Sequence, residues 1–521
     1  MLNKLDRETI KAELEKQNGP SLLANDPKLD KNALLDEAAA LYIEEGIASA
    51  LLVRLIKSRS YLIRLSANPD ILPAIRKHLV SSSPKLRRNS ARLIGQLSRS
   101  EQDAQLLIER LQSEEQRYVR PSLLLSLGSI GGEAAQKALD AYTPIPPADE
   151  TELKHYDEEC EALRLARVTA MTHEKHTFIK LDCPYEIELT SPDRLSEQLK
   201  DELDDLGFCA YDVRRNSVLV NTDDYIGLFS ARCFSEALFL IARGISEKPQ
   251  TVAKAAKEFI LNFMSATHEG KPPYRYRIEL IGEVEDRTAY KRAVRDLIDC
   301  DTLINAPSDY EIELRIIACG NASRLYLKLF THKDKRFFYR KETISASMYP
   351  STAAAVLRLA EEYLTINARV IDPCCGSGTL LFERGLLSPC TSLTGVDISH
   401  AAIDAARKNA TFAAIHGVKQ AKFICNDILR FESKRPYDEL ICNLPFGNRV
   451  GTHSSCEHLY EGLLNRFPLL LKRGGIAVLY TMEFTLLKAL IRERPGIDIL
   501  KTERTEAGGL TPMVFVLKFN R

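Results

Sequence analysis

The stretch ARVIDPCCGSGTLLFERG, residues Ala368 to Gly385, decides the fold of the C-terminal part of this chain. Its first five residues are typical of a buried strand, and the acidic residue Asp372 comes last. A loop with two glycines follows, and we expect a helix to begin near Thr379. Gly376 and Gly378 would let the loop backbone approach a ligand, although such a loop could also be a plain strand-to-helix turn.

Two further predicted strands end in polar residues. SLTGVDIS ends on Asp397, 25 residues after Asp372, and AKFICNDIL ends on Asn426 and Asp427. In a doubly wound sheet the carboxyl ends of the strands border one crevice, so these groups would converge there. Asp397 could then accept both hydroxyls of a ribose, while Asn426 and Asp427 could hydrogen-bond the amino edge of an adenine.

A third strand leads into the turn of YDELICNLPFGNRVG, residues Tyr437 to Gly451. It would deliver Asn443 into the same crevice, followed by Leu444, Pro445 and Phe446. Alone, these residues could be an ordinary turn with Phe446 as a core ring. The glycine loop and the two spaced acids favour an active site instead.

Residues Ile371 to Leu380 and Leu440 to Gly451 together resemble the Rossmann-like, S-adenosylmethionine-dependent methyltransferases that modify exocyclic amines of bases. NLPFGNRVG is most similar to the THUMP-containing guanosine N(2)-methyltransferases that act on tRNA. This resemblance implies S-adenosyl-L-methionine as cofactor and tRNA as partner. Because adenine-directed relatives also carry asparagine at the position of Asn443, the residue itself leaves guanine and adenine open.

The resemblance also implies the site residues. In the catalytic turn, the Asn443 oxygen and the Leu444 carbonyl would accept the two hydrogens of the amine, Pro445 would fix the turn, and Phe446 would stack on the extruded base. No strong general base is required, because the product nitrogen becomes acidic only as the methyl group arrives. The cofactor-binding set is Asp372, Cys375, Gly376, Gly378, Thr379, Asp397, Ile398, Asn426, Asp427, Ile428 and Asn443.

We expect a methyltransferase domain over residues 346–521. Its last part, GIDILKTERTEAGGLTPMVFVLKFNR, predicts two strands that match the antiparallel hairpin completing a seven-stranded sheet in this family. Cys375 takes the position of the family's cysteine, and packing is the default role for it and for Cys374.

Residues 173–345 show alternating strands and helices typical of an α+β region. The pattern predicts a helix in YIGLFSARCFSEALFLIARG, residues 225–244, and paired strands in YEIELRIIACG and RLYLKLFTHK. The region resembles a ferredoxin-like domain, residues 173–250, followed by a THUMP module, residues 251–345.

The stretch KLFTHKDKRFFYRKE, residues Lys328 to Glu342, combines cations with aromatic rings. Cations neutralise phosphates and rings stack on bases, so the combination suits RNA, although a solvated charged face over core rings explains it as well. Arg449 could contact RNA phosphate or pair on the surface. The predicted RNA-binding residues are Lys335, Arg336, Phe338, Arg340 and Arg449.

The N-terminal region, residues 1–172, has helical periodicity and a short repeat. Residues 85–97 and 118–130 align at a shift of 33 residues, with Arg and Gly recurring, which resembles a HEAT-type helical pair. An irregular helical bundle would fit as well. The region could bind a protein partner, and it shows no chemistry of its own.

The 521 residues are too many for one core, so we expect a multidomain α and α/β protein. Its 71 Lys and Arg balance its 71 Asp and Glu, which argues against a uniformly basic protein but leaves local patches open. The 12 cysteines are scattered without C-x-x-C spacing, so we expect reduced thiols, a cytoplasmic location and no metal site. No apolar run suggests a signal peptide or a membrane span.

Four other functions stay open. They are methylation of a guanine amine in ribosomal RNA, methylation of an adenine amine, methylation of a protein glutamine, and RNA binding without catalysis. The THUMP-like region favours RNA over protein, and the intact DPCCGSGT loop favours catalysis.

Overall fold

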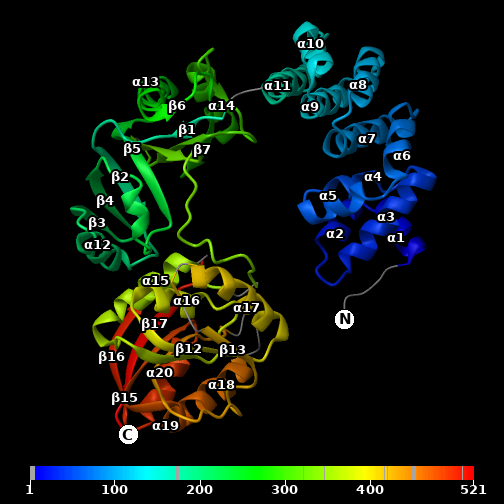
Figure 1. Ribbon diagram of the computed structural model, residues 1–521. Helices are drawn as coiled ribbons and strands as arrows, with labels where there is room; N and C mark the ends of the chain where they lie inside the picture. The colour runs from blue at the N-terminus through cyan, green and yellow to red at the C-terminus, as the bar shows by residue number, and fades with distance from the viewer. Residues whose placement is uncertain are drawn as a thin grey trace. The chain divides into compact units, whose positions relative to one another are not determined.

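The computed structural model of the chain divides into two compact units (Figure 1). The first comprises Met1–Lys175 with Ile304–Tyr310, and the second comprises His176–Leu303 with Glu311–Arg521. Each unit is described by itself. The described residues are 6–171, 175–320, 322–344, 347–415, 417–418, 421–446, 453–506 and 509–521.

The first unit is a stack of short helices, which confirms the helical prediction for this region. Its core is built from apolar residues of successive helices, and α7 packs against α4, α6 and α9, while α9 packs against α8 and α11. The helices are α1 (Arg7–Glu15), α2 (Gly19–Asn25), α3 (Lys31–Glu45), α4 (Ser49–Leu55), α5 (Arg59–Ser66), α6 (Ile71–Leu79), α7 (Pro84–Leu97), α8 (Glu101–Ser113), η1 (Arg117–Val119), α9 (Arg120–Ile130), α10 (Glu133–Ala141) and α11 (Leu153–Ala170).

The repeated glycines occupy equivalent positions in this stack. A Cβ atom at Gly95 of α7 would lie 2.7 Å from the Ser126 Cβ of α9. One at Gly128 of α9 would lie 2.6 Å from the Ala166 backbone of α11. In both places only glycine lets the next helix approach this closely. The two copies therefore share a packing device, which supports the predicted repeat, while the HEAT assignment itself stays a prediction.

The N-terminal part of the second unit is an α+β layer. Most of its strands belong to one continuous sheet, which includes the order β3-β4-β2-β5-β10-β9-β7, with β7 parallel to β9 and the other pairs antiparallel. β1 and β6 pair in a separate two-stranded sheet. Its elements are β1 (Thr177–Phe178), β2 (Tyr185–Thr190), α12 (Ser196–Asp205), β3 (Ala210–Arg214), β4 (Ser217–Thr222), η2 (Gly227–Ser230), β5 (Glu236–Ser246), α13 (Pro249–Thr267), β6 (His268–Glu269), β7 (Tyr274–Ile281), α14 (Arg287–Ile298), β9 (Ile312–Ala318) and β10 (Ala322–Leu329).

The helix predicted for residues 225–244 is wrong. This stretch forms η2 and then β5, a central strand between β2 and β10. Its apolar run is compatible with either structure, and pairing with two partners distant in sequence decides for a strand. Because β5 pairs with β10, the sheet also runs across the predicted boundary at residue 250.

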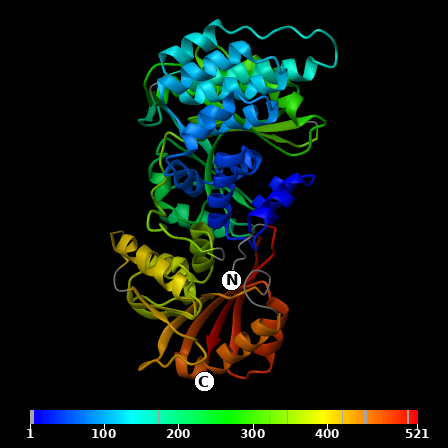
Figure 2. The same cartoon turned by 90° about the vertical axis from the view of Figure 1, so that its right-hand side faces the viewer.

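The C-terminal part of the second unit is a Rossmann-like domain, as predicted. Its sheet has the order β13-β12-β11-β14-β15-β17-β16, with β17 antiparallel to both neighbours (Figures 1 and 2). The strands are β11 (Ala368–Asp372), β12 (Cys390–Asp397), β13 (Ala421–Cys425), β14 (Tyr437–Asn443), β15 (Leu471–Thr481), β16 (Ile497–Arg504) and β17 (Met513–Phe519).

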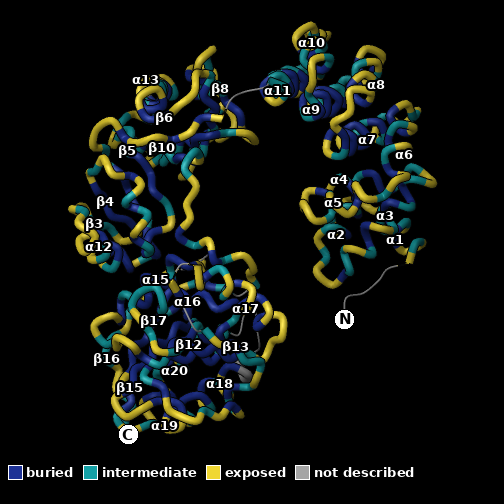
Figure 3. The backbone as a smooth tube through the Cα atoms, in the orientation of Figure 1, coloured by how far each residue is buried: buried dark blue, intermediate teal, exposed yellow. Residues whose placement is uncertain are grey.

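Helices cover both faces of this sheet, so its strands are mostly buried (Figure 3). Consecutive residues of a strand point to opposite faces of the sheet, so that Ile441 enters one hydrophobic core, here called the first core, and Leu440 enters another, the second core. α15 to α17 contribute to the first core and α18 to α20 to the second. The helices are α15 (Pro350–Leu359), α16 (Thr379–Leu387), α17 (His400–Ile415), α18 (His453–Asn465), α19 (Phe467–Leu470) and α20 (Phe484–Arg492).

Candidate active site

The carboxyl ends of β11, β12 and β14 lie side by side at one edge of the sheet. β11 pairs in parallel with both neighbours, so that Asp372 lies opposite Gly395, and Ile371 lies opposite Leu440. The structure therefore brings Asp372, Asp397 and Asn443 to one edge, as the sequence predicts.

The glycine loop folds over the ends of β11 and β12. The Cys375 N–H donates to the Val396 carbonyl at 3.0 Å, and the Gly376 N–H donates to Asp397 Oδ2 at 2.9 Å. Gly376 has φ +53°, and a Cβ atom there would meet only the Ile344 Cδ1 atom, at 3.4 Å. This position of the loop is thus open to a ligand.

Asp397 keeps free hydrogen-bonding capacity. Its Oδ2 accepts from Gly376, and its Oδ1 accepts from the Ser399 N–H at 2.9 Å. A carboxylate offers about four acceptor sites, so two remain for hydroxyl donors. The neighbouring Ile398 side chain is 75% exposed and offers an apolar surface beside this carboxylate.

The predicted residues after β13 are divided between surface and core. Asn426 is exposed, and its N–H donates to the Asp397 carbonyl at 3.0 Å. Asp427 is half-buried, and its Oδ1 accepts from the Leu429 N–H at 2.9 Å. Ile428 is buried in the second core, so its side chain is not exposed to a cofactor, and its predicted place in the cofactor site stays a prediction. Only its backbone could take that role.

Asp372 is buried at the base of the loop. Its Oδ1 accepts from the Cys374 N–H at 3.1 Å. Burial raises the pKa of Asp372 to about 8, and the negative charge of Asp397 adds to this effect. The free protein thus holds a neutral acid here at neutral pH, and a nearby positive charge would favour its ionisation.

The turn after β14 is fixed by its surroundings. The Leu444 N–H donates to the Tyr480 carbonyl at 2.9 Å, and the Leu444 side chain is buried. The Pro445 carbonyl accepts from the Tyr460 hydroxyl at 2.7 Å. The ring of Phe446 is half-buried, with its centroid 5.9 Å from that of Tyr480. These contacts hold the turn beside the glycine loop.

Three polar atoms near the ends of β14 and β15 and at the start of α16 are buried and have no hydrogen-bond partner among the described residues. They are Asn443 Oδ1, Tyr480 Oη and Thr379 Oγ1. Leaving such an atom unpaired costs about 1–3 kcal/mol, so clusters of them indicate a place prepared for a ligand. Sequence reasoning missed Tyr480, whose position depends on the pairing of Asn443 with Tyr480 across β14 and β15. The sequence marks Tyr480 only as a polar aromatic residue near the end of an apolar strand.

The predicted RNA-binding residues do not form one set. Lys335 is exposed, and Arg340 is half-buried with its guanidinium 5.4 Å from the Tyr349 ring. Phe338 is 42% exposed, with the Lys341 ammonium 3.2 Å from its ring centroid. Arg449 lies outside the described residues.

The prediction for Arg336 is wrong. Its side chain is buried, and its guanidinium lies 3.6 Å from the Phe234 ring centroid. It donates to the Ala231 and Phe234 carbonyls, both at 3.0 Å, and pairs with Asp334 at 2.8 Å. Arg336 thus ties its segment to the chain before β5, and its buried guanidinium is not exposed to a phosphate.

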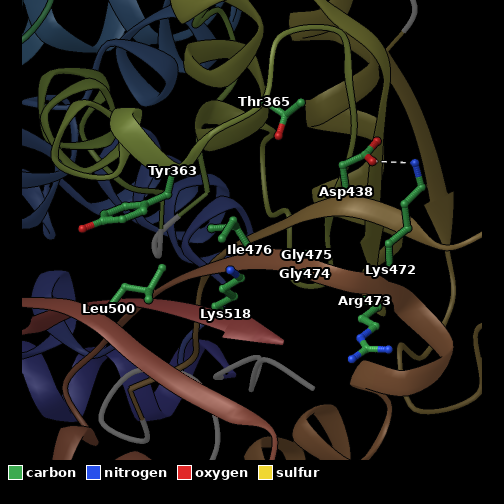
Figure 4. A pocket seen from close by; sticks show the side chains of 10 residues that line it. All are labelled: Tyr363, Thr365, Asp438, Lys472, Arg473, Gly474, Gly475, Ile476, Leu500 and Lys518. Atoms are coloured by element: carbon green, nitrogen blue, oxygen red, sulfur yellow. Dashed lines mark hydrogen bonds and ion pairs between the residues drawn. The ribbon is translucent and has the colours of Figure 1, made fainter. Parts of the chain in front are cut away.

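A separate cavity of about 350 Å³ lies at the opposite edge of the sheet (Figure 4). Its lining includes Asp438 near the start of β14 and Lys472 near the start of β15, joined by an ion pair of 2.6 Å. Asp438 and Asn443 lie on one strand, about 16 Å apart at the usual rise per residue. This cavity therefore does not belong to the candidate active site.

The described residues contain neither a metal-binding cluster nor a membrane-spanning helix. No group of His, Cys, Asp and Glu there is arranged to hold a metal ion. No described helix combines the length and apolarity needed to cross a membrane.

Residues 338–512 match the UPF0020 family, described as RMKL-like, methyltransferase domain. Two curated relatives match part of the chain. The tRNA (guanine(10)-N2)-dimethyltransferase of Methanothermobacter thermautotrophicus is 27% identical over 167 residues, which are 32% of this chain and 46% of that protein. The tRNA (guanine(6)-N2)-methyltransferase of Methanocaldococcus jannaschii is 26% identical over 222 residues, which are 35% of this chain and 57% of that protein.

Among solved structures, TrmN from Thermus thermophilus has 24% identity and a TM-score of 0.53, and it covers 64% of this chain and 99% of its own. SMU.472, titled a putative methyltransferase complexed with SAH, has 14% identity and a TM-score of 0.54. It covers 66% of this chain and 99% of its own. These two structures share the fold. The chain spans about half the length of the two curated relatives. Together with the family match, the sheet and its loop show that residues 338–512 carry an RMKL-like methyltransferase domain.

Proposed function

We propose that this protein transfers a methyl group from S-adenosyl-L-methionine to the exocyclic amine of a guanosine in tRNA. The observation that carries the proposal is the buried, unpartnered Asn443 Oδ1 at the end of β14, in a turn held beside the glycine loop. An acceptor kept free in this place suits a ligand that brings an N–H donor. The two relatives named as guanine-N2 tRNA methyltransferases support guanine and tRNA.

The residues at the strand ends fit the proposed cofactor. Bound there, S-adenosylmethionine would supply a methyl group on a positively charged sulfur. The open loop at Gly376 gives space for a ligand against the backbone. Asp397 retains acceptors for two ribose hydroxyls, Asp427 and Asn426 lie at the next strand end, and Asp372 can ionise toward a positive charge.

The turn residues would prepare the amine. An exocyclic amine is a weak nucleophile, because its lone pair is delocalised into the base. Acceptance of its hydrogens by Asn443 Oδ1 and the Leu444 carbonyl favours a pyramidal nitrogen and orients the lone pair. The Tyr460 hydroxyl fixes the turn by donating to Pro445. Phe446, only half-buried, offers a ring to the base, a contact worth about 1–3 kcal/mol.

The other parts of the chain complete the proposal. The α+β layer would be the ferredoxin-like and THUMP modules that hold the tRNA. Lys335, Phe338 and Arg340, which follow this layer in the chain, and Arg449 of the methyltransferase domain would be further contacts. The first unit would be a HEAT-like binding surface. A cytoplasmic location for the protein accords with the twelve free cysteines of the chain.

The test incubates the full-length protein with total tRNA and isotope-labelled methyl donor, followed by mass spectrometry of the nucleosides. We expect labelled 2-methylguanosine, and we expect Asn443→Ala to abolish it. A parallel reaction with ribosomal RNA tests the second candidate substrate, which some relatives named as ribosomal RNA large subunit methyltransferase G favour. Label in another nucleoside, or full activity of Asn443→Ala, would refute the proposal.

A further inference from the structure

The first unit contains a strongly basic segment between residues 49 and 100. Asp70 is the only acidic residue there, in a chain whose acids and bases balance overall. The cations of the segment are Arg54, Lys57, Arg59, Arg64, Arg76, Lys77, Lys85, Arg87, Arg88, Arg92 and Arg99. Such a local excess of one sign attracts polyanions.

Most of these cations lack an anionic partner. Only three contact a carboxylate: Arg64 pairs with Asp36 at 2.5 Å, Arg76 with Asp103 at 2.7 Å and Arg87 with Glu114 at 2.7 Å. For the remaining eight, the described part of the chain shows no ion pair. Structural ion pairing therefore does not account for the basic charge.

Three of the unpaired cations lie in one line on α7. Lys85, Arg88 and Arg92 follow each other at intervals of three and four residues, which places them on one face of the helix. The opposite face of α7 is buried in the core of the first unit. We name Lys85, Arg88 and Arg92 the basic stripe. The helices on either side, α4 and α9, contain no acidic residue that could neutralise it.

The stripe is fixed in position and borders an aromatic ring. The Arg92 Nε atom donates to the Ser122 hydroxyl at 3.0 Å, and the Arg88 guanidinium carbon lies 6.0 Å from the Tyr118 ring centroid. Burial, and then the charge of Arg88, lower the pKa of Arg92. Two arginines thus repel each other beside a half-buried tyrosine, and a bound anion would relieve that repulsion.

We propose that the basic stripe and Tyr118 bind the sugar–phosphate backbone of the RNA substrate. The inference rests on the proposed function in that the substrate is RNA. Arginines suit phosphate oxygens through paired hydrogen bonds, and a tyrosine ring can stack on a base. The Tyr118 ring beside Arg88 favours RNA over an acidic protein, because a base offers a flat face to stack on it and a carboxylate does not. Because both units belong to one chain, RNA held by the first is kept at high local concentration for the second.

Binding of labelled tRNA to the full-length protein, across a series of salt concentrations and without methyl donor, tests this inference. The triple variant Lys85→Ala, Arg88→Ala, Arg92→Ala should bind tRNA at least about tenfold more weakly, and its salt dependence should fall by about three phosphate contacts. The matched control, Lys16→Ala, Lys28→Ala, Lys137→Ala, loses the same charge elsewhere in the first unit and should bind like the wild type.

Three further variants guard against misfolding and generic charge effects. Arg88→Lys with Arg92→Lys keeps the charge and should retain the salt dependence. Tyr118→Ala should weaken binding of tRNA but not of poly-glutamate, whereas Tyr118→Phe should leave both unchanged. Equal affinity of the stripe variant and its control for tRNA would overturn the inference. So would loss of poly-glutamate binding with unchanged tRNA binding, which would indicate an acidic protein as the partner.

The tRNA-binding experiment and the methylation experiment can fail independently of each other. Asn443→Ala should bind tRNA with the wild-type salt dependence and yet fail to methylate it. Stripe-dependent binding without any methylation would contradict the proposed function alone. Methylation with stripe-independent binding would contradict the present inference alone.

Discussion

Asn443 and Tyr480 are paired residues at the carboxyl ends of β14 and β15, and each has a buried oxygen that finds no hydrogen-bond partner in the described part of the chain. The strand pairing places both side chains on the same face of the sheet, next to Phe446. The free protein thus carries an uncompensated cost at the point where we propose that the base enters.

The variant Asn443→Leu should show that this unpaired acceptor serves catalysis and does not stabilise the fold. We expect the free energy of unfolding to stay constant or to rise by about 1 kcal/mol, because an unsatisfied acceptor disappears. Methyl transfer should fall at least about 100-fold. Calorimetry and single-turnover assays measure the two effects.

Asn409→Leu is the matched control. Asn409 is fully buried, and its amide accepts from the Lys341 and Glu342 N–H groups and donates to the Glu342 and Ser377 carbonyls. Its replacement should cost about 2–4 kcal/mol. Equal destabilisation by the two variants would show that the Asn443 amide is not free.

Tyr460→Phe should loosen the turn. The Tyr460 hydroxyl donates to the Pro445 carbonyl and lies 2.6 Å from the Thr481 hydroxyl, so its loss should cost about 1–2 kcal/mol. The maximal rate should fall, since Asn443 is held less firmly. Tyr480→Phe removes an unpaired hydroxyl and should not destabilise the protein, and a thermal melt that reverses this order would contradict the assignment.

Asp372 should make the free protein less stable as pH rises. Its pKa in the fold, about 8, exceeds the ordinary value of about 4, so the native state binds more protons than the unfolded state between these values. Stability from this group is complete at low pH and falls by up to about 1.4 kcal/mol per pH unit until pH passes 8. Asp372→Asn should flatten this part of the melting curve against pH, and an unchanged profile would count against a neutral Asp372.

Glu439→Gln tests the buried ion pair beneath the site. Arg384 and Glu439 are both fully buried and joined at 2.7 Å between α16 and β14. Removal of one charge leaves the other unpaired and should cost about 3–5 kcal/mol, while the double change Arg384→Met, Glu439→Leu should recover much of it. The exposed pair of Lys472 and Asp438 is the control, and Lys472→Met should cost less than about 1 kcal/mol in denaturant unfolding.

Gly395→Ala should displace the glycine loop. A Cβ atom there would lie 2.6 Å from the Phe423 ring and 2.8 Å from the Cys375 sulfur. We expect a loss of about 1–3 kcal/mol in stability and weaker binding of S-adenosylmethionine, measured by titration calorimetry. Unchanged affinity would show that the loop does not contact the cofactor.

Local patterns predicted the C-terminal fold well because each element there carries its own signal. Asp372, Asp397 and Asn443 end strands that β-branched and apolar residues define, and parallel pairing then brings them together. Tyr480 and Tyr460 could not be assigned, because their roles depend on pairing and packing that no local pattern encodes.

The errors have the same origin. The apolar run in β5 fits a helix until β2 and β10 supply partners on both sides. Arg336 has the composition of an RNA contact, yet its carbonyl partners, Ala231 and Phe234, lie about a hundred positions earlier in the chain. Charge and periodicity describe a segment, whereas burial depends on what packs against it.

The pairing of β5 with β10 also restricts how this protein could have arisen by recombination. A crossover near residue 250 would pair β5 of one parent with β10 of the other, and where the two strands do not match, both edges would be left open and prone to aggregate. The span from β2 to β10 must therefore be inherited as one cassette, and chimeras that join homologues should survive only where the crossover falls outside it.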